Sequence, residues 1–190
     1  MSSIKGTQTE KNLILSFAGE SQARNRYTFF ASQAKKDGYE YIAAVFEETA
    51  AQEKEHAKRF FKFLEGGNAE VAAMFPAGVV GRTAENLKAA ADGEHEEWSE
   101  AYPKFAEIAK QEGFPEIAQA WTAISVAEKQ HEARFQGFLK TIESGTIFSR
   151  DGVTWQCRNC GFVANAGKAP EKCPACLHPQ SYFQILAENW

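Results

Sequence analysis

Two Glu-x-x-His motifs are the residues of this sequence best suited to chemistry. The segment QEKEHAKRFFKFL carries the first, from Glu53 to His56, and AEKQHEARFQGFL carries the second, from Glu128 to His131. A carboxylate and an imidazole three residues apart share one face of a helix, where both can reach the same ion. In a chain rich in glutamate a single such motif also fits an ordinary solvated helix face.

The two motifs lie within apolar stripes of helical spacing rather than on polar faces. Glu20 and Glu94 occupy the apolar stripes of the two preceding helical segments. Converging buried carboxylates repel each other or stay protonated unless cations share them. A buried network of ion pairs, with Arg59 and Arg134 as donors, is the structural alternative.

A pattern in which two helices each give a Glu and two each give a Glu-x-x-His is typical of di-iron and di-manganese helix bundles. Oxygen-rich ligation with two imidazoles suits iron or manganese better than copper or zinc. We expect two residues, one from each motif, to bridge the metals. These are Glu53 and Glu128, with Glu20 and His56 completing one metal and Glu94 and His131 the other.

Glu97 is a seventh candidate ligand. It lies about one helical turn beyond Glu94 on the same face, whereas its equivalent in the repeat described below is Ala23. A seventh carboxylate would make the two metals unequal. Tyr27 and Tyr102 point the same way and could hydrogen-bond to ligands or to a bound oxygen species, although core aromatic residues are common.

Four amphipathic segments must position these residues. Asp37-Gly38 and Gly113-Phe114-Pro115 form tight joints, which predict two antiparallel hairpins. The link 66–82, rich in Gly and Ala, has the length of the crossover between hairpins in a ferritin-like four-helix bundle. The predicted helical segments are Thr9–Lys36, Tyr39–Leu64, Thr83–Gln111 and Pro115–Ser144.

The two hairpins form an internal repeat. Residues around Glu20 match those around Glu94 at an offset of 74, but Tyr27 matches Tyr102 at an offset of 75. One residue has therefore been inserted in the third helix, and a π-bulge absorbs such an insertion most easily. His95 points about 100° away from Glu94 around the helix, so we expect it at the surface.

The composition restricts the class of protein. Apolar residues make up 44% and charged residues 24% of the 190 residues, which is typical of a soluble globular chain. No apolar run approaches the roughly 20 residues of a membrane helix, and the N-terminal segment lacks a secretory signal, so we expect a cytoplasmic protein with no membrane association. A net charge of -4 and the lack of a glycine-rich phosphate loop argue against a nucleic acid partner.

All four cysteines lie near the C-terminus as two C-x-x-C pairs, a strong signal for a four-thiolate metal site. A segment of about 40 residues buries too little surface to fold without such a metal. Zinc would make it a structural ribbon, and iron a one-electron carrier, which a redox-active di-metal site favours. The predicted ligands are Cys157, Cys160, Cys173 and Cys176, and His178 is not needed as a ligand.

The combination of these motifs resembles the rubrerythrin family over essentially the whole chain. The resemblance rests on Glu20, Glu53-x-x-His56, Glu94-x-x-Glu97 and Glu128-x-x-His131, followed by the four cysteines. Bacterioferritins and ferritins lack both the extra glutamate and the thiolate tail. The sequence departs from rubredoxin-type knuckles at Leu177, where they usually have glycine; a left-handed non-Gly residue costs about 1 kcal/mol or more.

The resemblance implies a non-heme peroxidase that reduces hydrogen peroxide to water and protects against oxidative stress. It implies an oxo-bridged di-iron centre in residues 1–146 and a mononuclear iron bound by four cysteines in residues 147–190. Electrons would come from NAD(P)H through a reductase or rubredoxin, and the chain would form a homodimer. In the family one iron exchanges a histidine for the extra glutamate between redox states, which here implies His56 and Glu97.

Two other functions remain open at this stage. A ferritin-class protein that oxidises or stores iron would use the same bundle ligands. A structural or adaptor bundle with a zinc ribbon would keep the fold and leave the bundle without metal.

Overall fold

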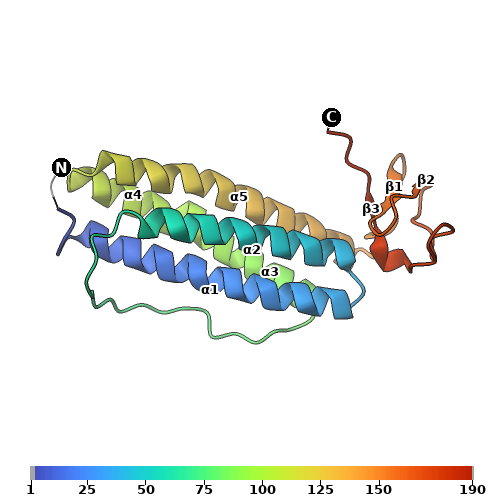
Figure 1. The fold of residues 1–190 in the computed structure, drawn as a ribbon, viewed down its shortest axis with the longest axis horizontal. Helices are drawn as coiled ribbons and strands as arrows, with labels where there is room; N and C mark the ends of the chain where they lie inside the picture. The colour runs from blue at the N-terminus through green and yellow to red at the C-terminus, as the bar shows by residue number, and fades with distance from the viewer. Residues whose placement is uncertain (1–2, 190) are drawn as a thin grey trace.

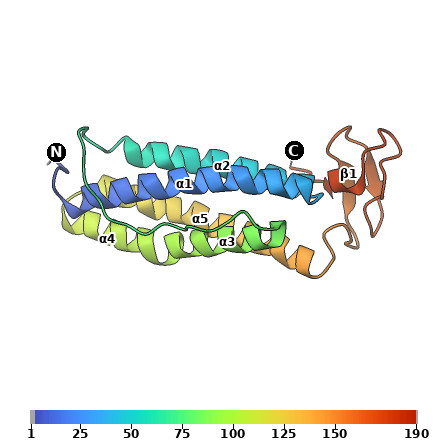
Figure 2. The same cartoon turned by 90° about the horizontal axis from the view of Figure 1, so that it is seen from below.

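In the computed structural model, which describes residues 3–189, four long rods form two antiparallel hairpins, as the sequence predicts (Figure 1). The first hairpin is α1 (Gln8–Lys36) and α2 (Glu40–Phe61). The second consists of α3 (Thr83–Glu96), η1 (Glu97–Ala101) and α4 (Tyr102–Gln111), which follow one another in one rod, and of α5 (Pro115–Glu143). The crossover 62–82 has no helix or strand and runs back along the bundle (Figure 2).

The five-residue π-helix η1 absorbs the inserted residue of the second repeat. It lies between Glu94 and Tyr102, where the change of offset predicts a bulge. A π-turn widens the helix by one residue, so the ligand-bearing face upstream and the aromatic face downstream both keep pointing into the bundle. The prediction of a local distortion in the third helix is confirmed.

Two carboxylates tie the hairpins together at opposite ends. Asp37, after α1, accepts hydrogen bonds from the backbone N–H and the hydroxyl of Thr83 at 2.9 and 2.7 Å. Glu112, after α4, accepts the same pair of hydrogen bonds from Thr9 at 2.8 and 2.6 Å. Each carboxylate satisfies backbone donors at the N-terminus of a helix in the other hairpin. The internal repeat therefore extends to the contacts that join its two halves.

The core places four carboxylates between two apolar layers. On each rod a buried glutamate is flanked by large buried apolar residues two helical turns away on either side. The spacing is seven residues everywhere except between Glu94 and Tyr102, where the π-helix makes it eight. The flanking pairs are Leu13 and Tyr27, Phe46 and Phe60, Leu87 and Tyr102, and Trp121 and Phe135.

A small antiparallel sheet follows the bundle. Its strands are β1 (Thr154–Cys157), β2 (Val163–Asn165) and β3 (Phe183–Ile185), in the order β2-β1-β3. Trp155 and Phe183 form its core together with two of the cysteines. The sheet lies beyond the end of the bundle at which α1 turns into α2 (Figure 1).

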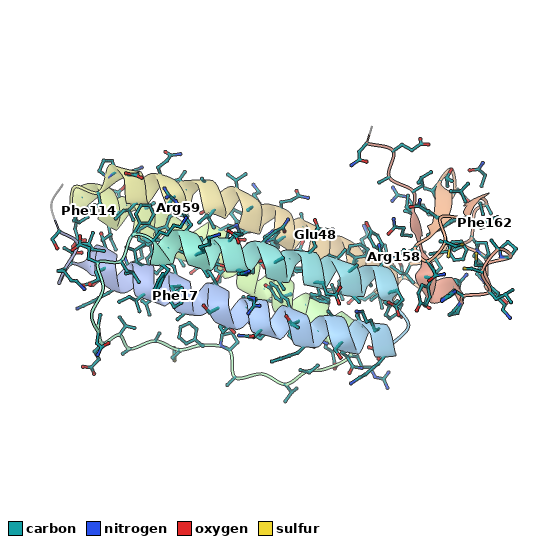
Figure 3. The ribbon with its side chains drawn as sticks, viewed as in Figure 1. Phe17, Glu48, Arg59, Phe114, Arg158 and Phe162 are labelled. Carbon is teal, nitrogen blue, oxygen red and sulfur yellow. The ribbon has the colours of Figure 1, made fainter. Side chains whose placement is uncertain are left out.

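Contacts with α2 and its N-terminal cap hold the C-terminal module against the bundle. The guanidinium of Arg158 lies 5.5 Å from the centre of the Tyr41 ring, at the junction visible in Figure 3. Tyr39 stacks on Phe148 with ring centres 6.3 Å apart. Within residues 3–189, no helix is long and apolar enough to cross a membrane.

Candidate metal centres

Six of the predicted ligands converge at the middle of the bundle in two overlapping groups. Glu20, Glu53, His56 and Glu128 form one group, and Glu53, Glu94, Glu128 and His131 form the other. In each group, ligand atoms from all four residues lie within 4.8 Å of one another. The two groups share Glu53 and Glu128, which is the arrangement that the sequence predicts for bridging carboxylates.

Each shared carboxylate directs one oxygen toward each histidine. Nδ1 of His56 lies 2.9 Å from Glu53 Oε2 and 2.8 Å from Glu128 Oε1. Nδ1 of His131 lies 3.1 Å from Glu53 Oε1 and 2.8 Å from Glu128 Oε2. The imidazole rings face each other at 6.0 Å between centres. The geometry has the pseudo-twofold symmetry of the repeat, and each imidazole Nδ1 faces its own pair of carboxylate oxygens.

Several of the clustered residues have raised pKa values. Burial alone would lower the pKa of both histidines, but the facing carboxylates raise it to about 9 for His56 and to about 12 for His131. Burial raises the pKa of Glu94 to about 8 and that of Glu20 well above its ordinary range. Metal ions entering the site would therefore displace protons.

Several buried ligand atoms make no hydrogen bond of suitable geometry, although some of them lie 2.8–3.1 Å from one another, which tests whether the site suits metal ions. A buried polar atom without a partner costs about 1–3 kcal/mol, so a set of them pointing at one place needs an explanation. Oxygens and an imidazole nitrogen of this kind are suitable ligands for iron. The residues therefore fit a pair of such ions. The unpartnered atoms are Glu20 Oε2, Glu53 Oε1, Glu94 Oε2, both Glu128 oxygens and His131 Nδ1.

Tyr27 and Tyr102 each hold the outer oxygen of a terminal carboxylate. Tyr102 donates to Glu20 Oε1 at 2.6 Å, and Tyr27 donates to Glu94 Oε1. Burial and the nearby carboxylates raise the pKa of both phenols well above the ordinary value, so they remain hydrogen-bond donors. The second oxygen of each glutamate is left free for a metal ion.

Glu97 belongs to neither group of four, although its carboxylate is close to them. It is the first residue of η1, and a Cβ placed on Gly19 would lie 3.6 Å from its Oε1. Burial, followed by the charges of Glu94, Glu128 and Glu53, raises the pKa of Glu97 well above its ordinary range. The predicted seventh carboxylate thus faces the site from the α1 side without joining the cluster.

The sequence analysis missed two polar residues around this site. Gln52 Oε1 lies 3.0 Å from Nε2 of His131. Glu132, largely buried, accepts a hydrogen bond from Nε1 of Trp98 at 2.5 Å and one from Gln136. Each of the two has an alanine at its repeat equivalent, which is the same signal that singled out Glu97.

His95 points away from the di-metal groups, as expected, and 55% of its side chain is exposed. Its Nδ1 lies 3.1 Å from Glu132 Oε1. Glu132 therefore contacts His95, which precedes Glu97 in the sequence, and Trp98, which follows it.

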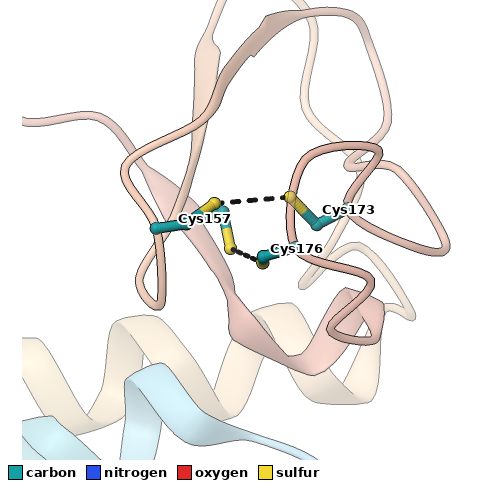
Figure 4. Close-up of side chains that lie close together, drawn as sticks. Cys157, Cys173 and Cys176 are labelled. Atoms are coloured by element: carbon teal, nitrogen blue, oxygen red, sulfur yellow. Dashed lines mark hydrogen bonds between the residues drawn. The ribbon is translucent and has the colours of Figure 1, made fainter.

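The four cysteines converge in the C-terminal module, where Figure 4 shows the side chains of Cys157, Cys173 and Cys176 facing one another. The Sγ atoms of Cys157 and Cys176 are 3.7 Å apart, and those of Cys160 and Cys173 are 3.6 Å apart. These distances are far longer than a disulfide bond of about 2.05 Å. They match the edge of a tetrahedron around a metal with metal–sulfur bonds of about 2.3 Å. The thiols therefore fit one tetrahedral ion.

Two equivalent turns carry the cysteines. Gly161 N–H donates to Cys157 O at 2.8 Å, and Leu177 N–H donates to Cys173 O at 2.9 Å. Leu177 is the one non-glycine residue of the described chain with a positive φ, at 63°. The turn therefore forms in the same way with leucine as with glycine. It costs free energy, because a residue with a side chain is held in the left-handed conformation. His178 is not part of the group of four ligands, and its Nδ1 lies 3.2 Å from the backbone oxygen of Cys176.

Family models match both the helix bundle and the C-terminal module of this chain. Residues 11–139 match the rubrerythrin family model, and residues 155–184 match the rubredoxin-like domain of rubrerythrin. This chain belongs to the rubrerythrin family. Rubrerythrin from Porphyromonas gingivalis is 60% identical, over 99% of this chain and 94% of the relative. Rubrerythrin from Nitratidesulfovibrio vulgaris is 56% identical over the full length of both chains.

Solved structures agree with the family assignment. Nigerythrin in a mixed-valence state has a TM-score of 0.65 and 29% identity, covering 98% of this chain and 94% of that chain. Bacterioferritin from Mycobacterium tuberculosis, at 16% identity and a TM-score of 0.62 over 72% of this chain and 86% of that chain, shares the bundle fold. The predicted ferritin-like bundle with a rubredoxin-like module is confirmed.

Membership of the rubrerythrin family defines the cofactors and the broad function. The bundle is a di-iron domain, and the four cysteines form a rubredoxin-like site. The chain is accordingly a di-iron oxidoreductase of oxidative-stress protection with rubredoxin-like electron transfer.

Proposed function

We propose that this chain is a peroxidase that reduces hydrogen peroxide to two molecules of water with two electrons and two protons. Glu20, Glu53, His56, Glu94, Glu128 and His131 hold the iron pair, and the four cysteines hold the single iron. Rubredoxin or an NAD(P)H-dependent reductase supplies the electrons in the cytoplasm, and the chain acts as a homodimer.

The observation that carries the proposal is the position of Glu97. It lies beside the shared carboxylates but outside both groups of four. A carboxylate held in reserve can join an iron when the charge of the pair rises and leave when it falls. A site for storage or for structure alone has no need of such a residue, whereas repeated turnover between two charge states does.

The six clustered side chains would hold two iron ions, which would supply, when ferrous, the two electrons needed to cleave one O–O bond. The carboxylates of the chain accommodate the change of charge because each can bind through one or both oxygens. His56 and Glu97 would alternate as ligands, so that six of the seven side chains would hold the pair in either charge state. The tyrosines keep the terminal carboxylates oriented throughout.

A cavity of about 200 Å³ supports a route for the substrate. It lies between α1, the η1 segment and the crossover, and Tyr27, Glu97 and Tyr102 all line it. Met74 and Phe75 of the crossover line it as well. A molecule of the size of hydrogen peroxide in this cavity meets the face of the site that the imidazoles leave uncovered. Glu97, with its raised pKa, is placed to hold a proton there.

The electron route begins at the cysteine site. Cys160 is exposed while Cys157 and Cys173 are buried, so a donor protein can approach the thiolates from one side. Four thiolates around one iron carry a single electron at a time. Two successive transfers from this module match the two-electron demand of the bundle.

A peroxide titration followed by visible absorption tests the proposal. We expect the thiolate–iron colour to bleach on anaerobic reduction and to return with one electron pair consumed per peroxide. Return of the colour with oxygen but not with peroxide would remove peroxide from the mechanism. A colourless module would place zinc there and contradict the electron route. Iron accumulation far above three ions per chain would indicate iron handling instead.

A further inference from the structure

The two histidines of the bundle differ in what holds their outer ring nitrogen. Gln52 Oε1 lies 3.0 Å from His131 Nε2, so the amide accepts a hydrogen bond and leaves Nδ1 free as the ligand atom. The repeat equivalent of Gln52, 75 residues further on, is Ala127. Within residues 3–189 the only side-chain hydrogen bond of His56 is made by Nδ1 with a carboxylate of the cluster, so no neighbour holds its outer nitrogen.

The two imidazole rings also differ in how much free space surrounds them. The His56 side chain is 16% exposed and that of His131 is 6% exposed. A cavity of about 450 Å³ lies between α2 and α5, and His56, Ala127 and Gln130 line it. His131 borders this cavity as well, but its outer nitrogen is tied to Gln52. His56 can therefore turn toward the cavity without breaking a hydrogen bond at its outer nitrogen.

Glu97 lies next to the group of ligands that contains His56, the histidine whose outer nitrogen is not held. A Cβ placed on Gly19 would lie 3.6 Å from Glu97 Oε1, and Gly19 precedes Glu20, a member of the His56 group. The charge of Glu97 also contributes to the raised pKa of Glu20. The two side chains that could alternate thus reach the same group of ligands from opposite sides of the bundle.

We propose that Gln52 and Ala127 determine which histidine can leave its metal. Gln52 is a positioning residue that fixes His131, and the missing side chain at Ala127 leaves His56 free to exchange with Glu97. The catalytic consequence rests on the proposed function, but the difference in anchoring does not.

Cobalt(II) titration of the metal-free full-length chain measures the anchoring without turnover. Hydrogen-bond partners of metal-bound histidines typically change metal affinity by about 10–100-fold. We expect Gln52→Leu to weaken one of the two bundle ions by that factor, and Gln52→Glu, which keeps an acceptor, to retain the affinity. Ala127→Gln should tighten the other ion, whereas Ala127→Leu, of similar size, should not. Gln52 is exposed and Ala127 partly exposed, so the fold tolerates these changes.

Unchanged cobalt affinities in both Gln52→Leu and Ala127→Gln would overturn the proposal. Crystal structures of iron-loaded Ala127→Gln, reduced and peroxide-treated, give the second readout. We expect His56 to keep one position in both and peroxide turnover to fall about tenfold or more. Wild-type turnover in this variant, with His56 still moving, would refute the inference and leave the peroxidase intact. Absence of peroxide turnover in the wild-type chain, with the cobalt shifts present, would refute the peroxidase alone.

Discussion

The phenol of Tyr102 on α4 donates a hydrogen bond to Glu20 on α1, with 2.6 Å between Oη and Oε1, and Tyr27 makes the symmetric bond to Glu94. Both pairs are buried and connect the two hairpins across the site. Each bond leaves one carboxylate oxygen free, so the tyrosines set the direction in which Glu20 and Glu94 present their ligand atoms.

Replacing either tyrosine by phenylalanine should therefore destabilise the metal-free protein and disturb the adjacent metal. A buried carboxylate oxygen that loses its partner costs about 1–3 kcal/mol. Urea unfolding of the metal-free single variants measures this cost, and iron content after reconstitution measures the effect on the site. Tyr41→Phe, at a partly buried position far from the carboxylates, is the matched control. Equal stability and equal iron content of Tyr102→Phe and the control would contradict both the stabilising and the orienting role of the hydrogen bond.

Glu97→Ala should slow peroxide turnover while both irons remain bound. The six clustered ligands persist in this variant, so iron content should stay near that of wild type. Turnover should fall on the order of tenfold to a hundredfold, because no carboxylate is left to replace His56. The neighbouring Glu100 is exposed and serves as the control position. Steady-state kinetics of peroxide reduction test this prediction. Equal turnover rates of Glu97→Ala and Glu100→Ala would contradict the role of Glu97 as the carboxylate that replaces His56.

The two carboxylates that join the hairpins should each stabilise the fold in a pH-dependent manner. Burial would raise the pKa of Asp37 and of Glu112, but hydrogen bonds from Thr83 and Thr9 lower it in the folded state. The stabilisation is therefore complete above the unfolded pKa values of about 4. It is lost as pH falls through the lower folded values.

Asp37→Asn and Glu112→Gln should each lower the free energy of unfolding by about 1 kcal/mol at pH 7. The difference from wild type should shrink as pH falls below about 4. Asp92→Asn removes only an exposed pair with Lys88 and serves as the control, with an expected change of at most about 0.5 kcal/mol. Urea unfolding of the metal-free proteins between pH 3 and 7 separates these cases, and a pH-independent difference would contradict the charge-assisted cap.

Glu132 should stabilise the π-helix because it holds Trp98, the residue after Glu97. Glu132→Ala removes the acceptor for the indole N–H and for Gln136, at a cost of about 1–3 kcal/mol. Glu132→Gln keeps an acceptor and should recover most of it. Amide hydrogen exchange over residues 94–102 is the measurement. We expect faster exchange in this segment of the alanine variant, with little change in α1; uniform exchange throughout would show that the contact is incidental.

The sequence predicts the parts of this molecule that have a period or a repeated spacing. The helical stripes, the doubled motifs and the change of offset before Tyr102 locate the ligands and the π-helix, because each is a local pattern. The sequence does not predict that Asp37 and Glu112 join the hairpins. Each lies on a polar surface and meets its threonine partner only after the hairpins assemble. Gln52 and Glu132 did carry a signal, namely an alanine at the equivalent place of the repeat.

Leu177→Gly should stabilise the C-terminal module. Leu177 has a φ of 63°, and a left-handed conformation costs a residue with a side chain about 1–2 kcal/mol. Its side chain is largely exposed, so little packing is lost with it. Glycine also gains freedom in the unfolded chain, which offsets part of the benefit, so we expect a net gain of about 0.5–1 kcal/mol. Gly161→Ala at the equivalent turn should change stability in the opposite direction. The rate of iron release from the thiolate site in denaturant measures both variants, and faster release from Leu177→Gly would show that the leucine side chain shields the site enough to outweigh its backbone cost.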